Sequence, residues 1–203
     1  MIAGHIKGVD AIRPIVRRAR DRGIGTLSVY TFSTENWSRP DDEVSGLFGL
    51  IDGAIQQHTD ELIAEGVRVR VIGRLHEAPA DVQRSIRGAE ERTAGGTRLT
   101  LNICFNYSGR AEIIDAAREL LARGIAAQDL DEEHFQAHLY TAGQPDVDLI
   151  IRTGGDQRIS NFLIWQAAYA ELVFRDTFWP DFQPDDFDAA LAEYASRERR
   201  FGG

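Results

Sequence analysis

The feature that most limits how this chain can fold is the alternation of short apolar segments with longer segments of helical periodicity. Four runs rich in apolar and β-branched residues predict strands at 26–32, 67–71, 99–105 and 147–151. Apolar residues at three- and four-residue spacing predict helices at 8–22, 41–66, from 79 onward, 110–121 and 185–196. This alternation predicts an α/β fold with a mostly parallel central sheet and helices on both faces.

A single domain is expected over residues 1–203. A chain of 203 residues is long enough to bury the core of one such domain. The segment 124–145 mixes Gly, Asp, Glu and Gln around a short helical stretch, so we interpret it as a long surface connection. The run 67–71 alternates valine with arginine and predicts a half-exposed or edge strand.

Composition argues against several classes of function. The net charge of −9 and the pI near 5.0 argue against a broad basic face, so no nucleic-acid partner is expected. No apolar run approaches the ~20 residues that span a bilayer, and a cytoplasmic protein is expected. Cys104 is the one cysteine, which excludes an intrachain disulfide and a cysteine-based zinc site and predicts a buried thiol.

Polar segments follow three of the predicted strands. They cover residues 33–39, 106–110 and 152–160. Ligands bind beyond the carboxyl ends of the strands in open parallel sheets, and these three loops are expected to open on that same edge. The sequence therefore predicts a site there.

The loop from Arg152 to Ser160 carries the strongest chemical signal. Arg152, Arg158 and the Ser160 hydroxyl surround the pair Gly154-Gly155. Guanidinium groups bind phosphate oxygens bidentately, and glycine allows an anion to approach the backbone closely. The pattern predicts a diphosphate cradle, and a solvated turn with surface arginines is an equally weighted alternative.

Glu171 lies between apolar neighbours, so its carboxylate must be paired or metal-bound if it is buried. A Mg²⁺ ligand is one interpretation, because diphosphate oxygens and water can supply the remaining ligands. A salt bridge to a nearby arginine is the other.

Weaker signals lie in other segments. The stretch 32–40 places hydroxyls, an amide, an indole and an arginine at a strand exit. These groups could position a substrate headgroup and relay a proton. Trp37 could equally be a core anchor. His5 could hydrogen-bond a phosphate oxygen or be an ordinary surface residue. The apolar stripe 47–63 could line a tunnel or simply pack in the core.

Several longer motifs occur together along the chain. They are Gly4-His5, Phe32-Ser33-Thr34-Glu35-Asn36-Trp37-Ser38-Arg39-Pro40, Arg152-Thr153-Gly154-Gly155, Arg158-Ile159-Ser160-Asn161-Phe162, Trp165-Gln166, Tyr169-Ala170-Glu171 and Arg200-Phe201-Gly202. In this order they closely resemble the cis-prenyltransferases, above all the bacterial undecaprenyl-type members of that family. The resemblance covers essentially the whole chain.

The resemblance implies a role for each matching residue. Arg152, Arg158 and Ser160 would bind isopentenyl diphosphate, and Glu171 would help to hold Mg²⁺. His5 would contact the allylic diphosphate. The mobile loop and the condensing carbons would be organised by Ser33, Asn36, Trp37, Arg39 and Glu43, with Ser33, Asn36 and Arg39 as the catalytic candidates. Arg200 and Gly202 match a motif that reaches the neighbouring subunit, which implies a homodimer.

The implied reaction elongates an allylic diphosphate such as farnesyl diphosphate with isopentenyl units. The allylic diphosphate ionises, the isopentenyl double bond attacks, and loss of a proton leaves a Z double bond. Thr31 and Leu99, at positions associated with the tunnel, include no bulky aromatic plug, so a medium-to-long, undecaprenyl-type product is expected. Such a product would serve as a lipid carrier for the cell wall and imply peripheral membrane contact on release.

The chain departs from the family pattern at its start. Family members begin with a strand followed by Asp-Gly-Asn-Gly-Arg-Trp, whose aspartate binds metal, and no such segment occurs in this sequence. We therefore expect impaired catalysis if the 203 residues are the whole product. The alternatives are a truncated form, a non-catalytic partner subunit of the same fold, and a generic α/β phosphate-binding protein. The complete isopentenyl motifs argue against the last two.

Overall fold

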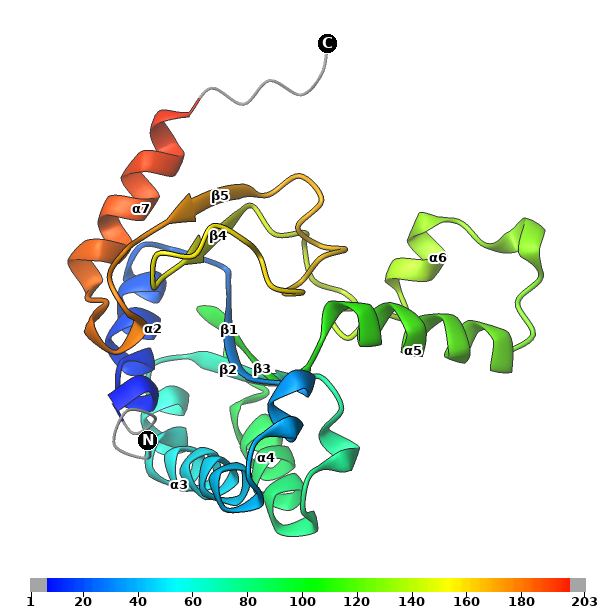
Figure 1. Ribbon diagram of the computed structural model, residues 1–203, viewed down its shortest axis with the longest axis horizontal. Coiled ribbons are helices and arrows are strands. Elements are labelled where there is room, and N and C mark those ends of the chain that lie inside the picture. Colours follow the sequence, from blue (N-terminus) through cyan, green and yellow to red (C-terminus); the bar gives the residue numbers. More distant parts are fainter. Residues whose placement is uncertain (1–6, 198–203) are drawn as a thin grey trace.

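The computed structural model describes residues 7–197, apart from the side chain of Asp42. Two parallel sheets form its centre (Figure 1). The first has the order β1-β3-β2, built from β1 (Thr26–Ser33), β2 (Val67–Ile72) and β3 (Leu99–Tyr107). The second pairs β4 (Leu149–Arg152) with β5 (Glu171–Phe174). The predicted single α/β architecture with parallel strands is confirmed.

Helices and short 3₁₀ turns connect the strands. The α-helices are α2 (Ile12–Asp21), α3 (Asp41–Ala64), α4 (Ala80–Thr93), α5 (Gly109–Ala122), α6 (Glu132–Gln136) and α7 (Pro184–Ser196). The 3₁₀ turns are η1 (Thr34–Ser38), η2 (Leu75–Glu77), η3 (Ala127–Asp129) and η4 (Trp179–Asp181). Figure 1 shows α5 and α6 projecting from the side of the molecule, beyond the sheets. No helix in residues 7–197 is long and apolar enough to cross a membrane.

The two faces of the first sheet have different coverings. Phe32 and Phe105 pack against α3 and α4, in a cluster that includes Phe48 and Val82. Because side chains alternate along a strand, Cys104 points to the opposite face, where it packs near Tyr107 and Leu163. Burial raises the pKa of the Cys104 thiol, and the prediction of a buried, unpaired cysteine is confirmed.

The predicted strands occur at the expected places, with one additional strand, and the first predicted helix is interrupted. β2 lies at the edge of its sheet with Arg68 exposed, as its alternation predicts. β5 was not predicted, because it has only four residues and begins with a carboxylate. The first helix is interrupted at Ala11, since Pro14 has no N–H to complete the preceding turn.

Candidate active site

The three predicted polar loops meet at one edge of the sheets. Trp37, in η1, donates through Nε1 to Oδ1 of Asn106, near the carboxyl end of β3, at 2.7 Å. Asn161, beyond β4, donates through Nδ2 to Oγ of Ser108 at 2.6 Å and to Oε1 of Glu35 at 3.2 Å. These bonds join the ends of β1, β3 and β4, so the convergence expected at their carboxyl ends is confirmed.

The loop after β4 brings its arginines and serine together. Arg152 donates through Nη1 to Oγ of Ser160 at 2.6 Å and to the carbonyl oxygen of Arg158 at 2.7 Å. Its Nη2 donates to Oδ2 of Asp156 at 2.8 Å, and Arg158 donates to both oxygens of the same carboxylate. We call Arg152, Asp156, Arg158 and Ser160 the arginine cradle. In it, one carboxylate occupies the position between two guanidiniums that an anionic substrate would take.

The glycine pair has a different role from the one the sequence suggests. Gly154 and Gly155 have φ angles of +89° and +80°, which favour glycine over any other residue. Their N–H groups donate to the carbonyls of Thr177 and Arg175, both at 2.9 Å. The amides are therefore already paired, and anion binding in this loop depends on the guanidiniums and the hydroxyl.

The η1 segment holds its predicted residues in local contacts. Ser33 donates through its backbone N–H to Oδ1 of Asn36 at 2.9 Å, in a capping box that fixes the Asn36 amide. Trp37 packs edge-on against Phe32, with ring centroids 5.6 Å apart, yet remains 40% exposed. It is both a core anchor and part of the site edge.

Arg39 and Glu43 form a pair at the start of α3. Arg39 Nη1 donates to Oε1 of Glu43 at 2.6 Å, across one helical turn. The arginine is exposed and the glutamate is largely covered. The pair thus fixes the junction between η1 and α3.

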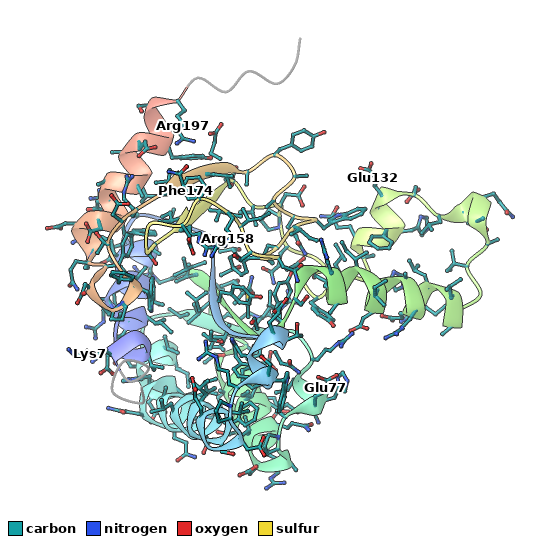
Figure 2. All side chains as sticks on the ribbon, viewed as in Figure 1. Lys7, Glu77, Glu132, Arg158, Phe174 and Arg197 are labelled. Atoms are coloured by element: carbon teal, nitrogen blue, oxygen red, sulfur yellow. The ribbon has the colours of Figure 1, made fainter. Side chains whose placement is uncertain are left out.

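The structure does not bring Glu171 together with the cradle. Glu171 begins β5 opposite Leu149, whereas Arg152 lies opposite Phe174, about 10 Å further along the strands. Its Oε2 lies 2.5 Å from Nη1 of Arg197, so the salt-bridge interpretation describes its contacts in this structure. Figure 2 shows Arg197 at the end of α7, apart from Arg158. Residues 7–197 contain no cluster of three His, Cys, Asp or Glu side chains that could hold a metal ion.

Three predicted site residues lie outside the residues that the structure describes. They are His5, Arg200 and Gly202. Their roles stay predictions.

Two asparagines organise the site and were not predicted. Asn106 and Asn161 adopt left-handed φ angles of +47° and +62°, which asparagine tolerates better than most residues. Asn106 is fully buried and also donates to Oε2 of Glu77 at 2.8 Å. The signal was available, since each asparagine lies in a polar turn directly beside a predicted site segment.

Replacing Asn161 with alanine should destabilise the protein by about 2 kcal/mol, because its side-chain hydrogen bonds with Ser108, Arg110 and Glu35 are lost and alanine disfavours the left-handed backbone. Asn161→Gly is the matched control, since it removes the same bonds without the backbone cost. Denaturant unfolding measures the free energy of unfolding of both variants, and the glycine variant should lose about 1 kcal/mol less than the alanine variant. Equal losses would contradict the strained-backbone part of this account.

An apolar cavity opens from the cradle. Its volume is about 1040 Å³, and its lining includes Arg152, Thr153 and Ser160 at the site edge. Elsewhere its walls come from β1, β4, α2 and one face of α3, and most of the lining is apolar. The cavity separates β1 from β4, whose edges on this side pair with no other strand in the described chain. The arginine and serine at the site edge and the apolar interior therefore border one continuous space.

A buried carboxyl group lies behind the site. Glu112, in α5, is 1% exposed and accepts from Tyr107 Oη at 2.5 Å, from the Tyr140 N–H at 2.9 Å and from Gln166 Nε2 at 3.0 Å. Burial raises the pKa of Glu112 above its ordinary value, although these hydrogen bonds act to lower it. Burial also raises the pKa of Tyr30, which borders the cavity, to about 12.

Comparison with known proteins identifies the family of this chain. Residues 1–202 match the prenyltransferase family model described as "Putative undecaprenyl diphosphate synthase". The isoprenyl transferase of Caulobacter vibrioides is 48% identical over 100% of this chain and 80% of its own length. That of Brucella suis is 51% identical over 99% of this chain and 81% of its own length.

Solved structures of related proteins have the same fold. Lavandulyl diphosphate synthase from Lavandula x intermedia, solved in complex with dimethylallyl diphosphate, superposes with a TM-score of 0.95 at 33% identity, covering 100% of this chain and 89% of its own. A probable undecaprenyl diphosphate synthase from Campylobacter jejuni gives 0.87 at 34% identity, covering 97% and 92%. The chain therefore belongs to the undecaprenyl diphosphate synthase family and is a prenyltransferase of isoprenoid synthesis.

Proposed function

We propose that this prenyltransferase adds isopentenyl diphosphate units to an allylic diphosphate such as farnesyl diphosphate, with Z double bonds. The product is a medium-to-long polyprenyl diphosphate of the undecaprenyl type. One observation carries the proposal: the arginine cradle opens directly into the 1040 Å³ apolar cavity. A diphosphate headgroup and a long hydrocarbon need such adjacent binding surfaces.

The cradle would bind the diphosphate of the isopentenyl substrate. Arg152 and Arg158 already hold an anionic group, the Asp156 carboxylate, in a charge-assisted geometry. A substrate diphosphate with more charge would displace Asp156 from the two guanidiniums and accept from Ser160. The arginines would then stabilise negative charge beside the reacting carbons, which is electrostatic catalysis.

The η1 segment would position the reacting carbons. Ser33, Asn36 and Arg39 are the catalytic candidates there, and Trp37 and Glu43 support them. The bond from Trp37 to Asn106 ties this segment to the site edge. His5 would contact the allylic diphosphate.

Mg²⁺ is the proposed cofactor. Glu171 offers one hard carboxylate oxygen besides the one that Arg197 holds, and Mg²⁺ takes its other ligands readily from diphosphate and water. Glu171 lies about 10 Å from Arg152 along the strands, so it would have to leave Arg197 and approach the cradle to help hold an ion there. Such an ion would supply further neutralisation of diphosphate charge.

Further elements of the proposal concern what completes the site. A family-type amino-terminal strand would pair with the edges of β1 and β4 that are unpaired in the described chain and fill the part of the cavity between them, leaving the part walled by α2 and α3 for the hydrocarbon. The aspartate loop of such a strand would then emerge at the site edge.

We also propose a homodimer in which Arg200 and Gly202 reach the neighbouring site. Ile114 and Leu121 on α5 offer exposed apolar contacts for its interface. A cytoplasmic enzyme with peripheral contact at the inner membrane face would release such a product.

The test is turnover. This chain, and a version that carries a family-type amino-terminal segment, are incubated with farnesyl diphosphate, isopentenyl diphosphate and Mg²⁺, and products are identified by mass spectrometry. The proposal predicts long polyprenyl diphosphates from the extended version. No elongation from either, under conditions where a relative is active, would favour a non-catalytic partner subunit.

A further inference from the structure

Helices α2 and α3 lie side by side and are joined by a row of ion pairs (Figure 1). Arg13 binds Glu61 through two contacts, Nε to Oε1 at 2.8 Å and Nη2 to Oε2 at 2.7 Å. Arg17 donates through Nε to Oε1 of Glu65 at 2.8 Å and also contacts Glu61. Arg20 Nη1 lies 2.8 Å from Oε2 of Glu65. We call these five residues the arginine–glutamate ladder.

Three ladder residues, Arg13, Glu61 and Glu65, line the end of the cavity that lies away from the cradle. α3 starts near the carboxyl end of β1 and ends before the amino end of β2, so its last turns lie at the opposite edge of the sheet from the polar loops. The α3 residues that line the cavity run from Leu47 to Glu65, about 27 Å at 1.5 Å per residue. This face becomes polar only in the last turns, at His58, Glu61 and Glu65.

A hydrocarbon chain meets different energetics at the two kinds of wall. Along the apolar part of the wall, each further methylene of the ligand that leaves water increases the ligand's affinity for the cavity roughly fourfold. At the ladder, further extension would strip water from charged groups, of which Arg13 and Arg17 are still about half exposed on the outside. The gain in affinity therefore ends where the ladder begins.

We propose that the arginine–glutamate ladder is the stop that limits the length of hydrocarbon the cavity accepts, and therefore the length of the product. This inference rests on the proposed elongating function. Replacing one matched pair by apolar side chains, Arg13→Leu with Glu61→Leu, would extend the apolar wall without leaving an unpaired charge.

The experiment measures binding and needs no turnover. Wild type and the Arg13→Leu/Glu61→Leu variant are titrated with n-alkyl diphosphates of increasing length. Binding is followed by the intrinsic fluorescence of the three tryptophans, of which Trp179 lines the cavity. Affinity should rise by roughly fourfold per methylene in both proteins up to the wild-type limit, and only the variant should continue to gain beyond it. Identical limits would overturn the role of the ladder.

The matched control is Arg22→Leu with Asp188→Leu. These two residues form an ion pair between α2 and α7, Nε to Oδ1 at 2.9 Å, and neither lines the cavity. The control should keep the wild-type limit of ligand length, and a shift equal to that of the test variant would overturn the assignment.

If the leucine variant unfolds, Arg13→Gln with Glu61→Gln should move the limit of ligand length in the same direction by less. An unchanged limit would overturn the role of the ladder. A wild type without any gain with length would overturn the proposed function itself.

Discussion

Replacing Arg152 with alanine should lower the affinity for isopentenyl diphosphate by on the order of a hundredfold to ten-thousandfold. The loss follows from two charge-assisted hydrogen bonds that its fork would make to the diphosphate, each contributing about 1.5–3 kcal/mol. Arg152 is also the hub of the cradle, since it binds Ser160 and the Arg158 carbonyl. Calorimetric titration of the substrate into both proteins measures the change. Arg152→Lys should recover only a small part of the lost affinity, because an ammonium group cannot make the two parallel hydrogen bonds of a guanidinium.

Arg175→Ala is the matched control for this prediction. Arg175 follows β5 directly, and its guanidinium pairs with Glu193 of α7 at 2.9 Å. Its removal should leave substrate affinity within about threefold, since exposed ion pairs contribute little to the fold. Equal losses for the two alanine variants would show that the effect reports general damage near β4 and β5.

Replacing Glu112 with alanine should cost about 3 kcal/mol of unfolding free energy, the largest stability effect that we expect. Alanine would leave Tyr107 Oη, the Tyr140 N–H and Gln166 Nε2 without their buried acceptor. In a chain of 203 residues, this corresponds to a fall in Tm of about 6–12 °C. A loss below about 1 kcal/mol would contradict the view that this carboxyl group holds α5 to the Tyr140 segment.

The same group gives a pH dependence with a definite sign. Burial raises the pKa of Glu112 in the folded state above its value of about 4.5 in an unfolded chain. The folded state then binds more protons, so this group's contribution to stability is greatest below the unfolded pKa and is lost as pH rises through the folded pKa. Glu112→Gln cannot titrate, and the difference in unfolding free energy between wild type and this variant should therefore fall as pH rises. An increase with pH would contradict a raised pKa.

Periodicity and length predicted most of the fold. The strand at 99–105 is recovered as β3, Leu99–Tyr107, because a long apolar run between turn residues has few alternatives. The order of the strands was not predictable in the same way. β1 pairs with β3 rather than with β2, its neighbour in sequence, and this choice depends on contacts between distant segments.

The convergence of the polar loops was predictable, and the pairing of side chains within them was not. The carboxyl-end rule for parallel sheets located the loops that Trp37 and Asn161 join. That Asp156 bridges the two arginines depends on side-chain orientations that no spacing determines. Glu112 left a clearer signal, since it shares one helical face with the buried Ala116 and Leu120.

The central claim is that this chain's family membership and arginine cradle serve Z-selective prenyl elongation. The most direct test is the configuration of the double bond formed when farnesyl diphosphate is extended by one isopentenyl unit, read by nuclear magnetic resonance on the isolated product of the extended version. The account predicts a Z double bond, and its formation should be lost in Arg152→Ala. An E double bond, or a Z product formed equally well without Arg152, would contradict it.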